Sequence, residues 1–405
     1  MKIRRSVEEK IREICENWGY EEIATPTFES LELFELKSGE EIIEEIYEFK
    51  DKSERELALR PELTASVMRF YSKELRAHPK PLKLFYFGNC FRYERPQKGR
   101  YREFWQFGTE VIGGEREFVE AEIMTLANKI IGSLELDFEF KIGNIAILRS
   151  LMNYYDIEQE KQDKVLSEID KEQENLKTSL EEIGLDSELI QNLIVIKNSS
   201  SPIEEAEKQF KELDISIKPI KRFENTIDYL KSFGISDYKI DLSVTRGLDY
   251  YIGTVFEIYA DGLGAQNQIC GGGTYKFPEL TKQDISSSGF GLGFDRIIQA
   301  MEEQNKIPTV SPRSQVYVAP LSEKFRKEAI ELTKKLRKHF SVEVDLKGRG
   351  IGDQLSFANR ISTPFVILLG EREIEENKIS LKDMETGDQE KLSLDKAIKE
   401  IKERL

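Results

Sequence analysis

The sequence predicts an α+β domain with a mixed, mainly antiparallel sheet and a helical insert, followed by a small α/β domain. Three observations support this fold class. The chain of 405 residues is too long for one ordinary hydrophobic core. Strand patterns found before residue 145 return after residue 225, and the stretch between them has helical spacing. Beyond residue 314, strand and helix patterns alternate, which is typical of a partly parallel sheet.

The first domain, residues 1–312, begins with helical spacing at 3–17 and continues into a sheet. Its longest strand signal is a hairpin at 83–113, whose loop is rich in proline, glycine and basic residues. A helix at 116–132 follows the hairpin. The other strand patterns are IYEF, ELALR, DFEFKIGN, YKIDLSV, TVFEIYA, QNQICGG and the glycine-rich SSSGFGLGF, which leads into a helix.

Residues 145–225 are rich in Glu, Lys, Leu and Ile at helical spacing, so we expect a helical insertion domain within the first domain. The polar stretch EEQNKIPTVSPRS near residue 310 is typical of a linker. After it, the strands QVYVAP, VEVDL and PFVILLG alternate with helices at 323–339, 352–361 and 394–404. This order predicts the α/β domain at 313–405.

Composition and charge favour a cytoplasmic protein without membrane segments. Hydrophobic residues make up 39% and charged residues 33%, and no run approaches the roughly eighteen apolar residues of a membrane span. The N-terminus lacks the apolar centre of a signal peptide. The net charge of −15 opposes indiscriminate binding to nucleic acid. Residues 315–405 nevertheless hold 18 basic and 17 acidic groups, a balance that suits RNA better than the acidic body does.

Few side chains are available for metal or nucleophilic catalysis. The three cysteines are far apart and form no CxxC pair, so neither a disulfide framework nor a structural zinc site is indicated. The two histidines, His78 and His339, lie in no setting typical of a catalytic triad or a metal site. We therefore expect no metal site made by the protein alone, and chemistry based on arginines, carboxylates, tyrosines and a bound cation.

The second strand of the hairpin carries a polar face. By the period of two, Gln106, Gly108 and Glu110 share one face, and apolar residues dominate the other. Gly108 removes a side chain between two hydrogen-bonding groups and leaves room for a small ligand over the sheet. The alternative is a strand face that is simply exposed to solvent.

Basic residues gather at the open end of the same hairpin. Arg92 and Glu94 share a face on the first strand, and Arg100 lies across the loop. Guanidinium groups are fixed forks suited to phosphate, so this cluster fits a triphosphate that meets a carboxylate substrate. A solvated run of charges is the alternative.

Several segments resemble the histidyl-tRNA synthetases, a family of class II aminoacyl-tRNA synthetases. The segments RGLDYYIGTVFE at 246–257 and LRPELTA at 59–65 resemble histidyl segments, and GFGLGFDRII at 289–298 resembles the third class II motif. The hairpin FRYERPQKGRYREFWQFGTE resembles the second motif, and Pro26 matches the first. The segment GRGIGDQLSFANRISTPFVILLGEREI resembles an anticodon-binding domain. The resemblance spans nearly the whole chain in the family's order and spacing.

The resemblance implies a class II catalytic domain at 1–312 and an anticodon-binding domain at 313–405. It implies that L-histidine and ATP form histidyl-adenylate, and that tRNA(His) then accepts the histidyl group. Mg²⁺ is expected as a cofactor, and a homodimer is expected with the Pro26 region at its interface.

Residue roles carry over from the same resemblance. Arg246 and Arg92 are implied as catalytic, because they place fixed positive charge near the α-phosphate. The implied ATP-binding residues are Arg92, Glu94, Arg100 and Arg296. Glu62, Thr64 and Gln106 are implied to bind the substrate ammonium group, and the implied residues around the imidazole are Glu110, Tyr250, Tyr251 and Tyr275. Arg95 and Gln97 are implied to contact the tRNA acceptor end.

Departures from the family's pattern and two other functions stand beside this hypothesis. Tyr275 is flanked by Thr274 and Lys276, where the family often has arginine and aspartate, and Asp295 stands where glutamate is frequent. One alternative is a non-catalytic paralogue such as the regulatory subunit of ATP phosphoribosyltransferase, which generally lacks the C-terminal domain. The other is a class II synthetase for another amino acid, which the RGLDYY segment and the Gln106/Glu110 pair oppose.

Overall fold

The computed structural model describes residues 1–405 except 36–42, 95–100, 172–174, 247–250, 264–266 and 310–311. It contains two compact units, Ile3–Ile307 and Pro308–Leu405. In the described parts of the chain, no helix is both long enough and apolar enough to cross a membrane.

An eight-stranded sheet, counted over the described residues, forms the centre of the first unit, with the order β1-β5-β6-β11-β10-β9-β7-β8. The β1/β5 and β7/β8 pairs are parallel, and the other pairs are antiparallel. The sheet is therefore mixed and mainly antiparallel, which confirms the predicted fold class. In sheet order, the strands are β1 (Glu21–Glu22), β5 (Leu82–Phe91), β6 (Glu103–Ile112), β11 (Ser287–Gly293), β10 (Gln268–Tyr275), β9 (Tyr251–Ala260), β7 (Phe138–Asn144) and β8 (Lys239–Ile240).

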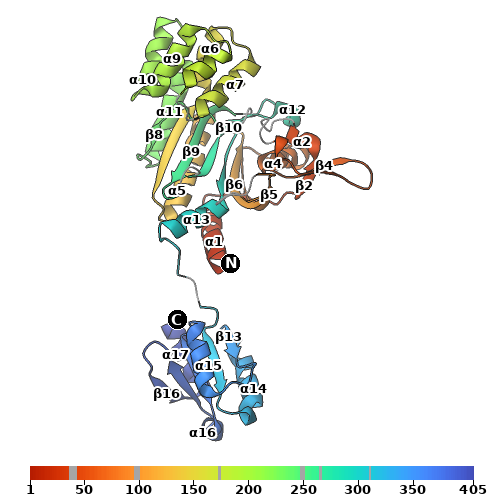
Figure 1. Ribbon diagram of the computed structural model, residues 1–405, viewed down its shortest axis with the longest axis vertical. Helices are drawn as coiled ribbons and strands as arrows, with labels where there is room; N and C mark the ends of the chain where they lie inside the picture. The colour runs from red at the N-terminus through yellow and green to blue at the C-terminus, as the bar shows by residue number, and fades with distance from the viewer. Residues whose placement is uncertain (36–42, 95–100, 172–174, 247–250, 264–266, 310–311) are drawn as a thin grey trace. The chain divides into compact units, whose positions relative to one another are not determined.

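Helices α1 (Lys2–Asn17), α5 (Arg116–Ser133) and α13 (Phe294–Glu303) pack against this sheet (Figure 1). In α1 the buried residues Val7, Ile11 and Cys15 recur every four positions, so one stripe of the helix enters the core. Helix α5 is apolar around most of its circumference because it lies between the sheet and helix α11 (Lys218–Ser232).

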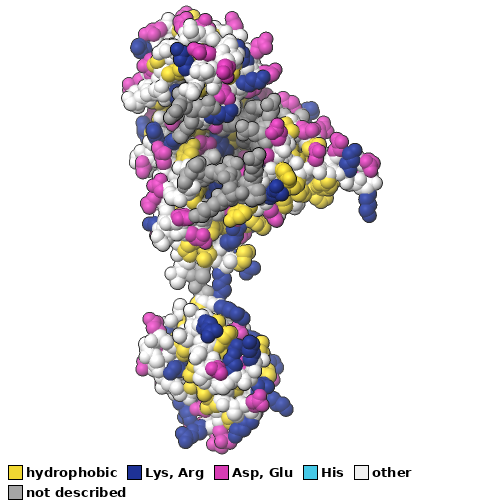
Figure 2. Space-filling view, viewed as in Figure 1, with side chains coloured by type: hydrophobic (Ala, Val, Ile, Leu, Met, Phe, Trp, Pro, Cys, Tyr) yellow, Lys and Arg dark blue, Asp and Glu magenta, His cyan; other side chains and the backbone are white. Residues whose placement is uncertain are grey.

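A side arm follows α1 in the sequence and is built on a three-stranded sheet in the order β2-β4-β3. Its core contains Phe34, Ala58 and Ala65. The strands are β2 (Phe28–Ser30), β3 (Glu48–Lys50) and β4 (Glu56–Leu59), and the helical elements are α2 (Leu31–Glu35), α4 (Thr64–Phe70), η1 (Tyr71–Leu75) and α12 (Pro278–Thr281). Phe28 and Phe49 are exposed, and Figure 2 shows hydrophobic side chains on the surface in this region.

The helical insert predicted between the strands is present, and its helices gather at one end of the first unit (Figure 1). Its residues Leu166, Leu180, Leu193 and Phe210 are buried, at the positions that the helical spacing indicates. The helices are α6 (Ile145–Tyr154), α7 (Gln159–Asp170), α8 (Leu176–Glu182), α9 (Ser187–Asn198), α10 (Pro202–Glu212) and α11. The last of them, α11, also packs on α5 and so joins the insert to the body.

The second unit is an α/β domain with a mixed sheet in the order β13-β12-β14-β15-β16. Strands β13, β12 and β14 are parallel, and β15 and β16 extend the sheet in antiparallel fashion. The strands are β12 (Val316–Pro320), β13 (Val342–Val344), β14 (Phe365–Leu369), β15 (Ile379–Asp383) and β16 (Gln389–Leu392). The helices are η3 (Glu323–Phe325), α14 (Arg326–Leu336), α15 (Ile351–Arg360), α16 (Glu371–Glu375) and α17 (Leu394–Arg404). The sheet is covered on both faces, as its parallel strands require.

Candidate functional site

Two neighbouring strands at the centre of the large sheet align a row of polar side chains with a row of glycines. Across the β6/β11 pair, Gln106 lies opposite Gly293, Gly108 opposite Gly291 and Glu110 opposite Gly289. A Cβ atom at Gly289 would lie 1.8 Å from Glu110 Oε2, and one at Gly291 would lie 2.3 Å from Gln106 Nε2. The glycines of β11 therefore provide the space that the polar side chains of β6 occupy.

The glycine row continues into β10, where it accommodates Arg246. Gly271 pairs with Gly291 on one side and with Glu257 of β9 on the other. A Cβ atom at Gly271 would lie 1.7 Å from Arg246 Nη1, so the guanidinium group lies directly over this glycine. Arg246 Nη1 donates to Glu257 Oε1 at 3.1 Å. Burial raises the pKa of Glu257, and the nearby Arg246 opposes that rise.

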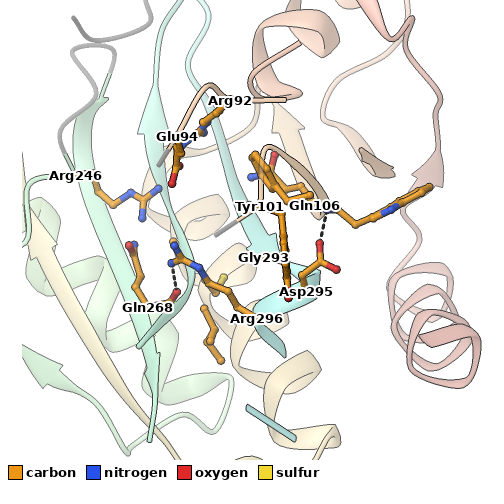
Figure 3. A pocket seen from close by; sticks show the side chains of 15 residues that line it. Arg92, Glu94, Tyr101, Gln106, Arg246, Gln268, Gly293, Asp295 and Arg296 are labelled. Carbon is orange, nitrogen blue, oxygen red and sulfur yellow. Dashed lines mark hydrogen bonds between the residues drawn. The ribbon is translucent and has the colours of Figure 1, made fainter. Parts of the chain in front are cut away.

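An open cavity lies over this part of the sheet, and three arginines face it from different elements (Figure 3). Arg92 follows β5, Arg246 precedes β9 and Arg296 lies in the first turn of α13. The other residues that line the cavity are Glu94, Tyr101, Phe104, Trp105, Gln106, Gln268, Ile269, Cys270, Gly271, Gly291, Gly293 and Asp295. Three guanidinium groups over a glycine floor suit a ligand that carries several negative charges.

Each arginine is held in place by protein contacts. Arg92 Nε donates to Pro61 O at 3.0 Å, and its guanidinium carbon lies 5.5 Å from the centre of the Phe104 ring. Arg296 Nη1 donates to Gln268 O at 2.7 Å. These contacts fix the positions of the guanidinium groups before a ligand arrives. Their charges are fixed as well, because guanidinium groups keep their proton at any physiological pH.

A buried hydrogen-bond network surrounds Glu110, farther along the same face of β6. Glu110 is 1% exposed and accepts hydrogen bonds from Thr64 Oγ1 at 2.9 Å, Tyr86 OH at 3.1 Å and Tyr275 OH at 2.5 Å. Burial raises the pKa of Glu110 to about 8, although the hydrogen bond from Tyr275 lowers it. This carboxyl therefore titrates near neutral pH, unlike the arginines of the cavity.

A second buried carboxylate, Glu62, lies at the start of α4. It accepts hydrogen bonds from Thr64 N at 2.5 Å and Ala65 N at 2.8 Å, and so satisfies two N–H groups at the helix N-terminus. Burial raises its pKa, and these backbone hydrogen bonds oppose the rise. Thr64 thus joins both glutamates, through its backbone to Glu62 and through its hydroxyl to Glu110.

The structure divides the residues expected at the site into two groups. The cavity brings together Arg92, Glu94, Gln106, Arg246 and Arg296. The buried network brings together Glu62, Thr64, Glu110 and Tyr275. Tyr251 is also buried, and its ring centre lies 6.5 Å from that of Tyr275. Arg95, Gln97, Arg100 and Tyr250 lie outside the described residues.

Several residues of the site were missed by sequence reasoning. Tyr86 lies opposite Gly108, and a Cβ atom at Gly108 would lie 2.4 Å from the Tyr86 hydroxyl oxygen. The pairing of a tyrosine with a glycine across the hairpin could have identified Tyr86, had the register been known. Strand pairing brings three further residues to the site, and the local sequence around each of them does not indicate that pairing. They are Glu257, Gln268 and Gly271.

Comparison with known families and proteins gives consistent results. Residues 1–297 match the family described as Histidyl-tRNA synthetase, and residues 315–404 match the family described as Anticodon binding domain. The chain is 45% identical over 400 residues to a histidine–tRNA ligase of Methanosarcina acetivorans, covering 98% of this chain and 94% of that one. It is 44% identical over 396 residues to a histidine–tRNA ligase of Archaeoglobus fulgidus, with coverage of 96% and 93%.

Solved structures give the same fold. A histidyl-tRNA synthetase from Nostoc matches with a TM-score of 0.81 at 23% identity, covering 99% of this chain and 95% of that one. The apo histidyl-tRNA synthetase of S. aureus matches with a TM-score of 0.76 at 29% identity, with coverage of 99% and 96%. A Bacillus halodurans protein described as an ATP phosphoribosyltransferase regulatory subunit/histidyl-tRNA synthetase matches with a TM-score of 0.75 at 25% identity, covering 91% and 94%.

Proposed function

Since the chain belongs to the histidyl-tRNA synthetase family, we propose that its cavity binds ATP and that the adjoining buried network binds histidine. The chain catalyses the ATP-dependent aminoacylation of tRNA(His) with L-histidine. One observation supports this separation into an ATP-binding part and a histidine-binding part. Three fixed guanidinium groups face an open cavity whose glycine floor continues to a buried carboxyl ringed by hydroxyl groups.

At the cavity end, Arg92, Arg246 and Arg296 hold the phosphates, and Glu94 lies beside the nucleotide. Attack of the histidine carboxylate on the α-phosphate builds negative charge where Arg92 and Arg246 lie. Fixed donors stabilise such charge without any proton transfer. Arg296, whose Nη1 donates to Gln268 O at 2.7 Å, supplies a third charge for the departing phosphates. We assign Arg100 to the same phosphates by family resemblance.

At the network end, Glu110 and Tyr275 meet the two nitrogens of the imidazole ring, with Tyr250 and Tyr251 beside them. Imidazole presents one nitrogen that donates and one that accepts, and a carboxyl next to a phenol can serve both. An amino acid that lacks either nitrogen leaves a buried polar group without a partner, which is how such a pocket discriminates. Glu62, Thr64 and Gln106 bind the ammonium group.

Mg²⁺ is expected to enter with the triphosphate. In nucleotide sites this ion is usually held by one or two carboxylates together with the phosphates. The cavity wall supplies the carboxylate of Glu94, and among the described residues no cluster of three His, Cys, Asp or Glu side chains could hold a metal ion by itself. Bound there, the ion would neutralise charge on the phosphates.

The remaining assignments concern the domains and the tRNA. We propose that residues 313–405 read the anticodon, in agreement with the family matched there, and that Arg95 and Gln97 contact the acceptor end. We propose that 1–312 form the catalytic domain and that 145–225 form its insertion domain. The helices of that insert run from Ile145 to Ser232.

We also propose a cytoplasmic homodimer, as the family resemblance implies. The Pro26 region leads into β2, where Phe28 is 52% exposed beside Phe49, which is 42% exposed. Exposed aromatic pairs of this kind support an interface on the side arm. Equilibrium sedimentation tests the proposal, and a mass of one chain would contradict it.

The experiment that tests the proposed function is histidine-dependent exchange of pyrophosphate into ATP, followed by charging of tRNA(His) transcripts. We expect exchange that requires histidine, and charging of tRNA(His) in preference to other tRNAs. Exchange without any amino acid, or with another amino acid in preference to histidine, would contradict the site assignment. A regulatory paralogue would bind histidine without charging tRNA. It is not favoured, because the similarity to histidine–tRNA ligases covers nearly the full length.

A further inference from the structure

The backbone of Arg246 has a conformation that arginine rarely adopts. Its φ angle is +60°, in the left-handed region where the Cβ atom crowds the following carbonyl group. Such a conformation persists only where the surroundings impose it. The contacts that impose it here come from the helical insert.

The contacting residue is Asp170, the last residue of α7. Its Oδ1 atom accepts hydrogen bonds from two consecutive backbone groups, Thr245 N at 2.9 Å and Arg246 N at 3.0 Å. The Thr245 hydroxyl lies 2.7 Å from Leu166 O, one turn earlier in the same helix, and 3.2 Å from Asp170 Oδ1. The C-terminal end of α7 therefore fixes the Thr245–Arg246 segment in two ways. It binds two backbone N–H groups of the segment, and it binds the Thr245 hydroxyl group.

The guanidinium group of Arg246 is held from the opposite direction, by the sheet. It donates to Glu257 of β9 and lies over Gly271 of β10. The direction of this side chain thus depends on two separate parts of the fold. The sheet fixes the guanidinium group of Arg246, and the insert fixes its backbone.

We propose that Asp170 is a positioning residue, through which the helical insert sets the orientation of Arg246 for adenylate formation. This inference rests on the proposed role of Arg246 at the α-phosphate. Without the acceptor at Asp170, the Thr245–Arg246 peptide relaxes toward negative φ and carries the guanidinium group away from the cavity. The insert, which contributes no residue to the lining of the cavity among the described residues, thereby acts on the chemistry.

The test compares three variants in histidine-dependent pyrophosphate exchange with the full chain. Asp170→Ala removes the acceptor, and we expect kcat to fall roughly tenfold to hundredfold, because small misplacements of a catalytic group have effects of this size. The KM values for histidine and ATP should change by less than about threefold, since the lost interaction acts mainly in the transition state. Asp170→Asn keeps an oxygen acceptor and should stay within about threefold of wild type.

The matched control is Asp163→Ala, in the same helix. Asp163 accepts a hydrogen bond from Arg149 at 2.6 Å within the insert, and among the described residues it makes no hydrogen bond or ion pair with Thr245 or Arg246. This variant measures the effect of weakening the insert alone, and it should exchange at close to the wild-type rate. Equal losses in Asp163→Ala and Asp170→Ala would assign the effect to the stability of the insert and overturn the proposal.

A double-mutant cycle with Arg246→Ala decides whether Asp170 acts through Arg246. If it does, Asp170→Ala should have no further effect once the arginine side chain is gone. An additional tenfold loss in the double variant would overturn the proposal, and so would an Asp170→Asn variant as impaired as Asp170→Ala. Wild-type protein without histidine-dependent exchange would instead refute the proposed function, so the two failures are distinguishable.

Discussion

The arginine-lined cavity and the buried network around Glu110 lie on the same face of β6, four residues apart at Gln106 and Glu110, yet they differ in how their charges are maintained. The cavity is open, and its arginines carry charges that pH does not alter. The network is closed, and its central carboxyl changes protonation near pH 8. On the proposed assignment, ATP meets a site whose charges are already in place, whereas histidine must replace hydrogen bonds that the protein makes with itself.

This difference predicts two kinds of response to substitution. Changes in the cavity should reduce the rate of the chemical step with little dependence on pH, since no proton is gained or lost there. Changes in the network should alter the binding of histidine and the dependence of stability on pH. The following three predictions test that contrast in order of decreasing effect.

The largest effect is expected from Arg246→Ala. The rate of histidine-dependent pyrophosphate exchange should fall by about a hundredfold to a thousandfold, which is typical for the loss of one preorganised donor. The fractional loss should be the same at pH 6.5 and pH 8.5. Arg55→Ala, which removes an exposed arginine bonded to Asp51, is the control and should retain full activity. Near-normal exchange by Arg246→Ala would remove this residue from the chemistry.

A smaller effect is expected from Tyr275→Phe, which deletes the 2.5 Å hydrogen bond to Glu110. Phenylalanine cannot meet the imidazole nitrogen that we assign to Tyr275. A buried polar group left without its partner costs about 1–3 kcal/mol, so kcat/KM for histidine should fall roughly fivefold to hundredfold. The KM for ATP should stay unchanged, because Tyr275 does not line the cavity. The exposed Tyr154 provides the matched control as Tyr154→Phe. Equal changes in the KM for histidine and for ATP would contradict the separation of the two regions.

The smallest effect, when taken over a single pH unit, concerns the pH dependence of stability, measured by denaturant unfolding of wild type and Glu110→Gln. The pKa of Glu110 is about 8 in the fold, and its ordinary value is 4.5. Between pH 4.5 and pH 8, this carboxyl therefore binds a proton in the folded state that it has lost in the unfolded state. The contribution of Glu110 is therefore fully present below pH 4.5 and is lost as pH rises through 8. Relative to Glu110→Gln, wild type should lose up to about 1.4 kcal/mol of unfolding free energy per pH unit in this window. Parallel pH profiles would show that Glu110 does not titrate there.

Local periodicity in the sequence predicted much of the fold. The alternation along 103–112 placed Gln106, Gly108 and Glu110 on one face, and the helical spacing of the insert matched its buried residues. The antiparallel hairpin of β15 and β16 was not predicted, because β15 follows directly on the charged stretch EREIEENK and neither strand has a strong strand pattern. The sequence also predicts a helix entered at Pro61, which a first turn tolerates, but α4 begins three residues later, at Thr64.

The candidate site was predictable only where its residues lie within recognisable segments. Arg92, Arg246 and Arg296 were identified by motif resemblance, but their convergence on one cavity depends on the pairing of β6, β11, β10 and β9. Tyr86 and Asp170 were missed for the same physical reason. Each reaches the site through contacts between residues far apart in the chain, 24 residues for Tyr86 to Glu110 and 76 for Asp170 to Arg246.

The glycine row has a genetic consequence. Any missense change in a glycine codon introduces a Cβ atom, and at four positions that atom would fall within 2.4 Å of a side chain of the site. The collisions pair Gly271 with Arg246, Gly289 with Glu110, Gly291 with Gln106 and Gly108 with Tyr86. A single substitution in the floor must therefore displace the side chain above it, and so it changes a wall of the site as well. A library of variants of this enzyme should recover changes at the floor only together with a change in the side chain above it.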